Sequence, residues 1–398
     1  MKQGWERKKL GDCFESIRNG VTIKQERGAI GVPITRIETL SGGVFNRDRL
    51  GYANIQSTEK YASYVLDDGD LLLSHINSKT YIGRTVVYNR LGDEEIIHGM
   101  NLLRLKAIRT ILSPYYAFYC FKSDVFKDQI ASYRKDAVNQ SSIPVSDLKK
   151  VLIPVPPLSI QERIVEELDC ISGIIEKKKE QLKELDALAQ SIFYTMFGDP
   201  VENDKGWEVA PLKDSVVEMF LGPFGSALKT SCYVDKIDSY CMVYEQKHAI
   251  RKTMEVETHY INKEKFDSLK RFEVHSGDFI MSRRGTIGEI FRIPEHAPIG
   301  IIHPSLMKIR IKEDVYSPTF FIKLLTCIVK NENTSGNCVQ MAITAKELGA
   351  RKPILPPLPL QQEFAKKIEA IEKQKELIRK SIGEVETLLA SRMQEYFE

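Results

Sequence analysis

The sequence predicts an α+β protein in which two tandem α/β domains stand in a pseudo-twofold arrangement, separated by a long antiparallel two-helix coiled coil. Three observations predict this fold: the chain repeats itself, each copy ends in a long heptad-patterned helix, and short strand-like runs precede each helix. We expect a first domain over 1–150, a lead-in and helix over 151–200, a second domain over 201–350, and a distal lead-in and helix over 351–398.

Length and composition limit the class of protein. The 398 residues give room for two or three ordinary domains, and 42% hydrophobic with 28% charged residues is typical of a globular chain. The net charge of +3 argues against nucleic-acid binding through charge alone, so such binding must rest on local patches. Seven cysteines without a CxxC pair predict reduced thiols in a cytoplasmic protein, and no signal peptide or membrane-spanning run is expected.

The repeat is recognised from matches that keep the same order at offsets between 200 and 208 residues. The pairs, first copy against second, are Gly4-Trp5-Glu6 with Gly206-Trp207-Glu208, Gly20–Lys24 with Gly225–Lys229, Gly69-Asp70 with Gly277-Asp278, Ile97-His98 with Ile302-His303, Ser113-Pro114 with Ser317-Pro318, Gln140 and Ile143 with Gln340 and Ile343, and Pro156–Leu158 with Pro356–Leu358. Chance similarity would not keep this order, so the matches indicate a tandem duplication.

Before each long helix, short apolar runs bounded by turns predict strands. In the first copy these runs cover 30–37, 70–74, 85–88 and 102–105. One helix is expected over 115–127, with its counterpart over 319–330. This mixture favours an α+β domain but leaves its topology open.

Each copy ends in a Pro-rich extended lead-in followed by a helix of about 38 residues, roughly 57 Å long. Ser159 and Glu162 have the spacing of a capping box, and Pro359 suits the first turn of the second helix. Gly198-Asp199-Pro200 ends the first helix after Phe197, and the second helix runs to the end of the sequence.

A heptad seam follows each helix and is apolar at seventeen of twenty positions, which predicts that the helices pair. Antiparallel pairing gives the layers Ile164–Tyr396, Ile171–Leu389, Leu182–Ile378 and Met196–Phe364, with Lys178 facing Ile382 and Lys375 facing Leu185, their ammonium groups turned outward. The seam residues expected to hold the pair and dock partners are Ile164, Leu168, Ile171, Leu182, Leu185, Ile192, Phe364, Ile368, Ile371, Ile378, Ile382 and Leu389. The alternative is that each helix packs on a separate domain core.

Polar loops that follow apolar strands supply candidate DNA contacts, because their side chains suit base edges and phosphates. The loop after Gly-Asp reads SHINSKT in one copy and SRRGT in the other, and Gln can read adenine. The candidates are Lys24, His75, Asn77, Ser78, Lys79, Arg84, Gln140, Ser226, Lys229, Arg283, Arg284, Thr286 and Gln340. A solvated hairpin loop, and structural hydrogen bonds from the two Gln, are the alternatives.

The sequence holds no recognised catalytic or metal motif: no Walker motif, no HExxH, no dinucleotide fingerprint and no NPPF-like methyltransferase motif. Asp238 followed by Glu245-Gln246-Lys247 imitates the acidic-x-Lys end of a nuclease motif. The first copy has no acidic-x-Lys at the matching place, so we interpret this segment as the exposed end of a strand.

Several motifs together resemble the specificity subunit of type I restriction–modification enzymes. They are GPFGSALK over 222–229, GDFIMSRRGTIG over 277–288, and the Pro-Pro-Leu lead-ins with Gln-Glu over 156–162 and 356–363. The resemblance covers the whole chain. The first copy has His75-Ile76-Asn77 where the second has Arg283-Arg284-Gly285, as expected if the two copies read different sequences.

The resemblance implies a non-catalytic DNA reader with no cofactor or metal of its own. Each domain would be a target-recognition domain for one half of a bipartite, asymmetric double-stranded site, and the helices would set the unread spacer. Two modification subunits carrying S-adenosylmethionine would dock on the helices and methylate adenine, and two restriction subunits using ATP and Mg can join them. The alternatives are a coiled-coil scaffold with two protein-binding domains, or an enzyme with an unrecognised site.

Overall fold

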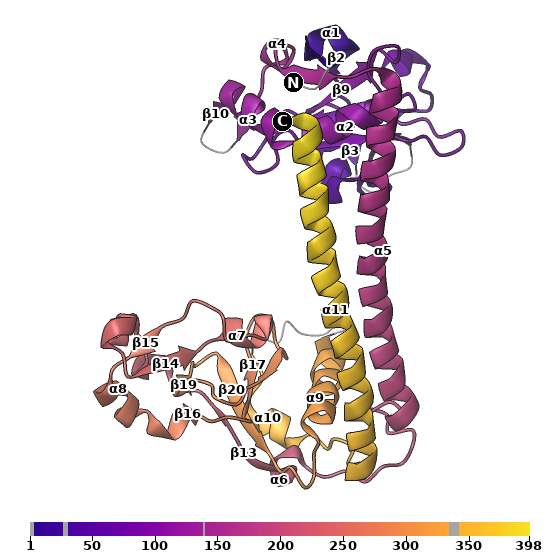
Figure 1. Ribbon diagram of the computed structural model, residues 1–398. Coiled ribbons are helices and arrows are strands. Elements are labelled where there is room, and N and C mark those ends of the chain that lie inside the picture. Colours follow the sequence, from indigo (N-terminus) through magenta and orange to yellow (C-terminus); the bar gives the residue numbers. More distant parts are fainter. Residues whose placement is uncertain (1–3, 27–30, 138–139, 334–341) are drawn as a thin grey trace. The chain divides into compact units, whose positions relative to one another are not determined.

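A computed structural model describes residues 4–26, 31–137, 140–333 and 342–398 (Figure 1). The chain divides into two compact units, the first formed by 1–180 with 379–398 and the second by 181–378. Helices α5 (Leu158–Phe197) and α11 (Leu358–Phe397) therefore contribute residues to both units. Within the described ranges, no helix is long and apolar enough to cross a membrane, and the six cysteines there are free thiols.

The first unit is built on an antiparallel sheet in the order β2-β9-β6-β8. Its strands are β2 (Phe14–Asn19), β9 (Leu102–Ala107), β6 (Leu71–Ser74) and β8 (Thr85–Val87). Successive strand residues point to opposite faces, so Leu71 and Leu73 enter one hydrophobic cluster while Leu72 enters another. The sheet is therefore buried on both faces, which explains its continuous apolar runs.

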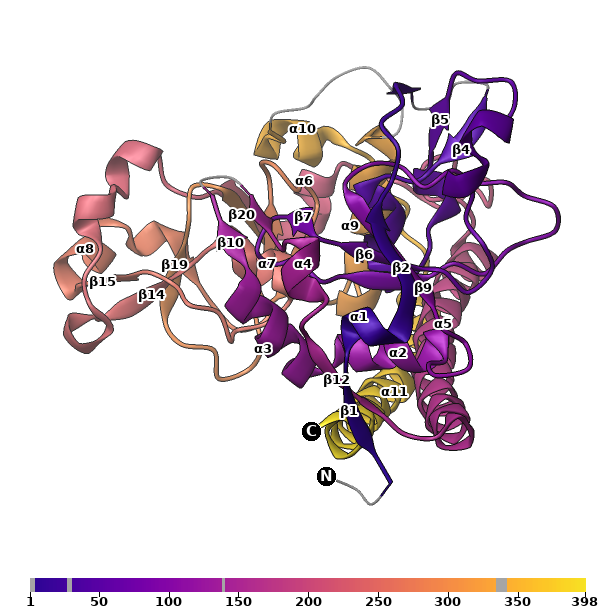
Figure 2. The same cartoon turned by 90° about the horizontal axis from the view of Figure 1, so that it is seen from above.

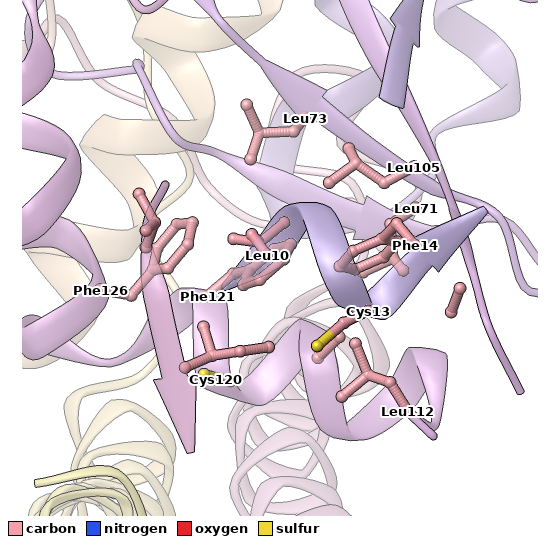
Figure 3. Close-up of a cluster of buried hydrophobic side chains, with 14 of the residues drawn as sticks. Leu10, Cys13, Phe14, Leu71, Leu73, Leu105, Leu112, Cys120, Phe121 and Phe126 are labelled. Carbon is pink, nitrogen blue, oxygen red and sulfur yellow. The ribbon is translucent and has the colours of Figure 1, made fainter. Parts of the chain in front are cut away.

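The main core of the first unit lies where α2 (Pro114–Lys122) and α3 (Asp124–Tyr133) pack against this sheet (Figure 3). Phe121 stacks on Phe126 with ring centroids 4.3 Å apart, and such aromatic pairs add about 0.5–1.5 kcal/mol to the effect of burial. The short helix α1 (Leu10–Cys13) adds Leu10 and Cys13 to the same core. Burial raises the pKa of the Cys13 thiol to about 11.

Three smaller sheets complete the first unit, in the orders β1-β12, β3-β5-β4 and β10-β11-β7. Strand β1 pairs antiparallel with β12, the lead-in to α5 (Figure 2). The strands are β1 (Glu6–Lys9), β3 (Gln25–Glu26), β4 (Val32–Ile34), β5 (Gly51–Ala53), β7 (Ile76–Asn77), β10 (Lys135–Asp136), β11 (Ser141–Ser142) and β12 (Leu152–Val155). The short helices are η1 (Ile37–Gly43), η2 (Arg47–Arg49), η3 (Glu59–Tyr64) and α4 (Val145–Leu148).

The second unit has a corresponding sheet in the order β13-β20-β17-β18 and a second sheet in the order β15-β14-β19-β16. Strands β14 and β19 run parallel, whereas the other pairs are antiparallel. The strands are β13 (Val216–Leu221), β14 (Cys241–Tyr244), β15 (Tyr260–Ile261), β16 (Glu273–Val274), β17 (Phe279–Ser282), β18 (Ile290–Arg292), β19 (Gly300–Ile302) and β20 (Leu306–Ile311).

The helices of the second unit alternate with these strands. They are α6 (Leu212–Ser215), η4 (Gly225–Ala227), η5 (Thr230–Cys232), η6 (Lys236–Asp238), α7 (Gln246–Arg251), α8 (Lys263–Ser268), η7 (Lys270–Phe272), α9 (Pro318–Asn333) and α10 (Ala345–Ala350).

The sheets confirm the tandem duplication. Both have the same strand order, and the first strand of each is irregular at the same place, between Phe14 and Ser16 and between Val216 and Glu218. A β-bulge bends its strand locally, so its recurrence means that the two copies share their curvature as well as their topology.

One sequence match between the copies is wrong. Gly20 directly follows β2 and Gly222 directly follows β13, and a Cβ at either position would lie 2.2 Å from a backbone carbonyl oxygen, that of Gly99 or of His303. Gly20 therefore corresponds to Gly222, not to Gly225, because both positions exclude a side chain. It follows that Lys24 and Lys229 are not equivalent residues.

A glutamine at the start of each long helix fastens that helix to its domain. Gln161 Oε1 accepts the Ser113 N–H at 2.8 Å, and its Nε2 donates to the carbonyls of Ile111 and Pro156 at 2.9 and 2.8 Å. Gln361 is equally buried and forms the matching bonds, at 2.9, 3.0 and 2.8 Å, with Ser317, Val315 and Pro356. The recurring Gln of the motif is therefore a structural residue.

Within each unit the two long helices run antiparallel, as predicted. In the first unit Arg392 lies 2.8 Å from Glu167. The predicted layers place Arg392 opposite Leu168, the next residue along the helix. In the second unit the Phe364 ring lies 5.6 and 5.5 Å from those of Phe193 and Phe197. All twelve predicted seam residues are buried or half-buried.

Two details of the helix pairing differ from the prediction. The Lys375 ammonium is not turned outward: it lies 2.7 Å from Asp186 and 2.6 Å from Glu372, and its side chain is only 9% exposed. The ends of the helices also join the domain cores, since Ile164 belongs to the core of the first unit and Phe364 to that of the second. Pairing and packing on the domains thus occur together.

Other expected boundaries need correction. The helix expected over 115–127 breaks at Ser123, whose hydroxyl donates to the Cys120 carbonyl at 2.7 Å and whose side chain caps α3. Residues 31–37 of the run expected as a strand over 30–37 are described, and they comprise the short strand β4 and the first residue of η1. Helix α5 begins at Leu158, so Ser159 lies inside the first turn and does not cap it. Helix propensity did not reveal the break at Ser123, because the local hydrogen bonds of one capping side chain decide it.

Candidate nucleic-acid interface

In the first domain, several predicted DNA contacts come together where the loop after β6 meets the β10–β11 hairpin. Strand β7 in this loop pairs with β11, so Asn77 stands opposite Ser141. The Lys79 ammonium lies 3.0 Å from the Asp136 carboxylate of β10. The candidates brought together are His75, Asn77, Ser78, Lys79 and Gln140, with Arg84 closing the same loop.

Burial separates the members of this group. Ser78, Lys79 and Gln140 are exposed, so a ligand can reach their side chains, that of Lys79 beside its ion pair with Asp136. Asn77 is half-buried and donates to Ser74 Oγ at 3.1 Å. His75 is buried, its carbonyl accepts the Ile143 N–H at 2.9 Å, and burial lowers the pKa of its imidazole to about 4. His75 is therefore neutral at pH 7 and supports the loop from inside.

Lys24 belongs to a different part of the first domain. It is exposed and directly precedes β3, in the sheet β3-β5-β4 rather than in the β10-β11-β7 group. A polar cleft opens beside this segment, lined by Thr22, Gln25, Arg36, Glu38 and Asn101 together with apolar neighbours.

In the second domain the loop after β17 carries Arg283, Arg284 and Thr286. Arg283 is buried, and its guanidinium donates to the Pro304 carbonyl at 3.1 Å. Its own carbonyl accepts the Ile343 N–H at 3.1 Å, as the His75 carbonyl accepts that of Ile143, so Arg283 takes the place of His75. Arg284 and Thr286 are exposed at the tip.

The remaining candidates of the second domain lie on another segment or outside the described residues. Ser226 and Lys229 are exposed on and after η4. Tyr233, four residues beyond Lys229, stacks on the His259 ring with centroids 4.1 Å apart. Gln340 lies outside the described residues.

A polar group lies beside the Arg284 loop, and it includes Glu245 and Lys247, which the sequence suggested only as the exposed end of a strand. We call Tyr233, Glu245, Lys247, Thr258 and His259 the Glu245 cluster. Glu245 directly follows β14, and its Oε1 accepts a hydrogen bond from His259 Nδ1 at 2.7 Å. Its Oε2 accepts from Thr258 Oγ1 at 3.0 Å and lies 2.9 Å from the Lys247 ammonium.

The Glu245 carboxylate is ionised although its side chain is only 13% exposed. Burial acts to raise its pKa, but hydrogen bonds from Lys247, His259 and Thr258 outweigh this effect and hold the pKa below its ordinary value. Both oxygens of the carboxylate are thus bound by partners inside the cluster. Across the part of the chain that the structure describes, no three His, Cys, Asp or Glu residues are grouped to hold a metal ion.

Comparison with known proteins decides the family. The family model for the type I restriction modification DNA specificity domain matches residues 2–186 and 250–387. The chain belongs to this family. It is a type I specificity subunit, and such subunits are not catalytic by themselves.

Relatives support this assignment over nearly the whole specificity subunit. The putative type I restriction enzyme MjaX specificity subunit of Methanocaldococcus jannaschii is 30% identical over 387 residues, covering 96% of this chain and 90% of the relative. The EcoKI specificity subunit of Escherichia coli K12 is 28% identical over 193 residues, covering 46% and 41%.

Solved structures share the fold of the specificity subunit. One solved structure concerns complex assembly and conformational transition of the type I R-M system. Its chain matches with a TM-score of 0.63 at 16% identity, and the match covers 100% of this chain and 98% of the solved one. The type I S subunit of M. genitalium has a TM-score of 0.52 at 14% identity, covering 99% and 96%. The predicted fold class, mixed α/β domains separated by a long helix, is confirmed.

Proposed function

We propose that this specificity subunit reads a bipartite, asymmetric double-stranded DNA site, with the target-recognition domains 1–150 and 201–350 each reading one half. The observation that carries the proposal is the β6–β8 loop and its counterpart after β17. Gly83 N–H donates to the Ser74 carbonyl at 2.8 Å, and Gly288 N–H donates to the Ser282 carbonyl at 2.9 Å. The same closure holds different polar tips, which is what readers of two different half-sites require.

The exposed candidates are the proposed direct contacts, because only they can reach a groove without rearrangement. They are Lys24, Ser78, Lys79 and Gln140 in the first domain, and Ser226, Lys229, Arg284 and Thr286 in the second. Asn77, His75, Arg84 and Arg283 are buried or half-buried, so they act mainly by holding the loops. Arg84 does so by placing its guanidinium 4.4 Å from the Tyr81 ring.

We further propose that the helices set the spacer and dock two modification subunits, which carry S-adenosylmethionine and methylate adenine in each half-site. Two restriction subunits that use ATP and Mg join this complex in the cytoplasm. An apolar groove in the second unit supports docking on the helices. It is lined by Leu185, Leu188, Leu377 and Ile378, and Leu377 is 68% exposed. Leu188 lines the same groove and is 48% exposed, and exposed apolar side chains gathered in one place are typical of an interaction site.

The test of DNA reading is to express the subunit with its modification subunits and map methylated adenines in host DNA. The expected result is one bipartite motif with unlike halves and a fixed spacer. Methylation without an enriched bipartite motif would refute the proposal.

The docking surface is tested separately by the double substitution Leu188→Glu and Leu377→Glu. We expect these charges to abolish co-purification of the modification subunits while the thermal midpoint stays unchanged. Val201→Glu, at an exposed apolar position away from the groove, is the matched control. Undiminished co-purification of the double variant would exclude this surface.

A further inference from the structure

The Glu245 cluster lies next to the loop that carries Arg284. Gln246, the residue after Glu245, donates from Nε2 to the Arg284 carbonyl at 2.7 Å. His303 lies close to the Glu245 cluster and to the Arg284 loop. Burial lowers the pKa of its imidazole, and the charges of Glu245, His259 and Arg284 also act on that pKa. Because β14 and β19 run parallel, the residues that follow them, Glu245 and His303, stand at the same edge of the sheet.

Within the cluster His259 is the member that faces outward in a fixed orientation. Its side chain is 49% exposed, whereas that of Glu245 is 13% exposed. The ring stacks on Tyr233 with centroids 4.1 Å apart and an interplanar angle of 20°. The stack and the Glu245 bond together fix both the plane and the rotation of the imidazole, which is the preorganisation that a recognition contact needs.

The Glu245 bond also determines what the other ring nitrogen can do. A carboxylate only accepts, so Nδ1 of His259 carries the hydrogen of the bond to Glu245, and in this tautomer of the imidazole Nε2 has no hydrogen and is an acceptor. Phosphate oxygens only accept as well, so they do not pair with such a nitrogen. The amino groups of adenine N6 and cytosine N4, both in the major groove, are the complementary donors.

We propose that His259, positioned by Glu245 and Tyr233, is a specificity-determining residue that accepts a hydrogen bond from the amino group of an adenine or cytosine in the second half-site. This inference rests on the proposed reading of DNA by the second domain. Glu245 is a positioning residue, since both of its oxygens are already bound within the cluster.

The first domain carries opposite chemistry at the same place. Arg36 N–H donates to Thr39 Oγ1 at 2.9 Å, and Glu245 N–H donates to His248 Nδ1 at 3.0 Å, so both residues begin a helix in the same way. Both residues also come after strands that pair in parallel: Ile34 of β4 pairs with Ile97, and β14 pairs with β19. A cation in one copy and a carboxylate–imidazole pair in the other are expected where two half-sites differ.

The test compares wild type, His259→Ala, Glu245→Gln and the control His296→Asn, each in complex with the modification subunits. His296 is another exposed histidine of the second unit, and Asn tolerates its φ of +65°. Methylated sites in host DNA give base frequencies at every position, and binding to the preferred duplex is measured at several salt concentrations. Thermal midpoints report folding.

We expect His259→Ala to lower discrimination at one position of the second half-site by about fivefold, the effect of one hydrogen bond. Glu245→Gln should weaken the same position, and the first half-site and the His296→Asn motif should stay as in wild type. An unchanged motif for His259→Ala would overturn the inference. So would a uniform loss of affinity with a smaller salt slope, which would indicate a phosphate contact. A wild-type complex without any bipartite motif would instead refute the proposed function itself.

Discussion

Gln361 offers the sharpest test of how the long helix is joined to its domain. Replacing it with Ala removes three hydrogen bonds at once and leaves the Ser317 N–H and the carbonyls of Val315 and Pro356 without that partner. A buried polar group left unsatisfied costs about 1–3 kcal/mol. Even at the lower limit for each group, Gln361→Ala should lower the stability of the second unit by about 3 kcal/mol.

The expected loss is large enough to measure by calorimetry. For a unit of this size, about 1 kcal/mol shifts the melting temperature by about 2–4 °C, so the second unit should melt about 6–12 °C earlier. Hydrogen exchange should increase first where β20 leads into α9 and at the start of α11. Gln161→Ala should have the same effect on the first unit only, because Gln161 makes the equivalent bonds there.

The neighbouring Gln362 is the matched control, since it is the same residue type in the same turn but exposed. Gln362→Ala should change the free energy of unfolding by no more than about 0.5 kcal/mol, so its melting temperature should stay close to that of the wild type. The two variants are expected to differ by about 3 kcal/mol in the free energy of unfolding. If their melting temperatures instead lie within about 2 °C of each other, the three bonds do not fasten the helix and the reasoning fails.

Three further predictions concern single residues. Arg283→Ala should destabilise the second unit by about 1–3 kcal/mol, because the carbonyls that the guanidinium binds lose their donor. Arg284→Ala should keep the melting temperature and change methylation at the second half-site only, since its side chain is exposed. Equal effects of the two substitutions would contradict this assignment. Gly383→Ala should raise stability by about 0.5–1 kcal/mol, since a Cβ there meets nothing within 4 Å in a helix interior, and a lower melting temperature would show an unforeseen contact. A hydrogen bond from Arg47 lowers the pKa of Glu94 to about 2. The stability that this pair contributes is therefore complete above the ordinary Glu pKa of about 4.3 and is lost as the pH falls towards about 2. In Glu94→Gln the melting temperature should depend less on pH over that range.

The parts of the fold that the sequence predicted are those in which one physical signal recurs. The Gly-Asp turn could be found because Gly69 and Gly277 both adopt a φ of +84°, which other residues rarely adopt. The antiparallel helix pair could be found because a heptad seam must be covered along its whole length. Neither signal depends on knowing which strands are neighbours.

The parts that the sequence did not predict depend on tertiary contacts. Glu245 and His303 are brought together only by the parallel pairing of β14 and β19, which no local pattern announces. Arg283 looked like a DNA contact because its residue type suits one, but its side chain turns inward to a carbonyl of a distant loop. The Gly20 match failed because a three-residue shift within a short motif leaves the pattern GxxxK intact.

In a duplicated reader of an asymmetric site, identity between the copies and difference between them have opposite meanings. Asp70 and Asp278 are identical, buried and held by Arg104 and Arg310, so their recurrence reflects the turn that they stabilise. A residue that read the same base in both copies would make the half-sites alike at that position. Recognition must therefore be sought where the backbone role is shared but the chemistry is not. His75 against Arg283 meets that condition but points inward, whereas Arg36 against Glu245 meets it at a polar edge, which is why the Glu245 cluster is the stronger candidate.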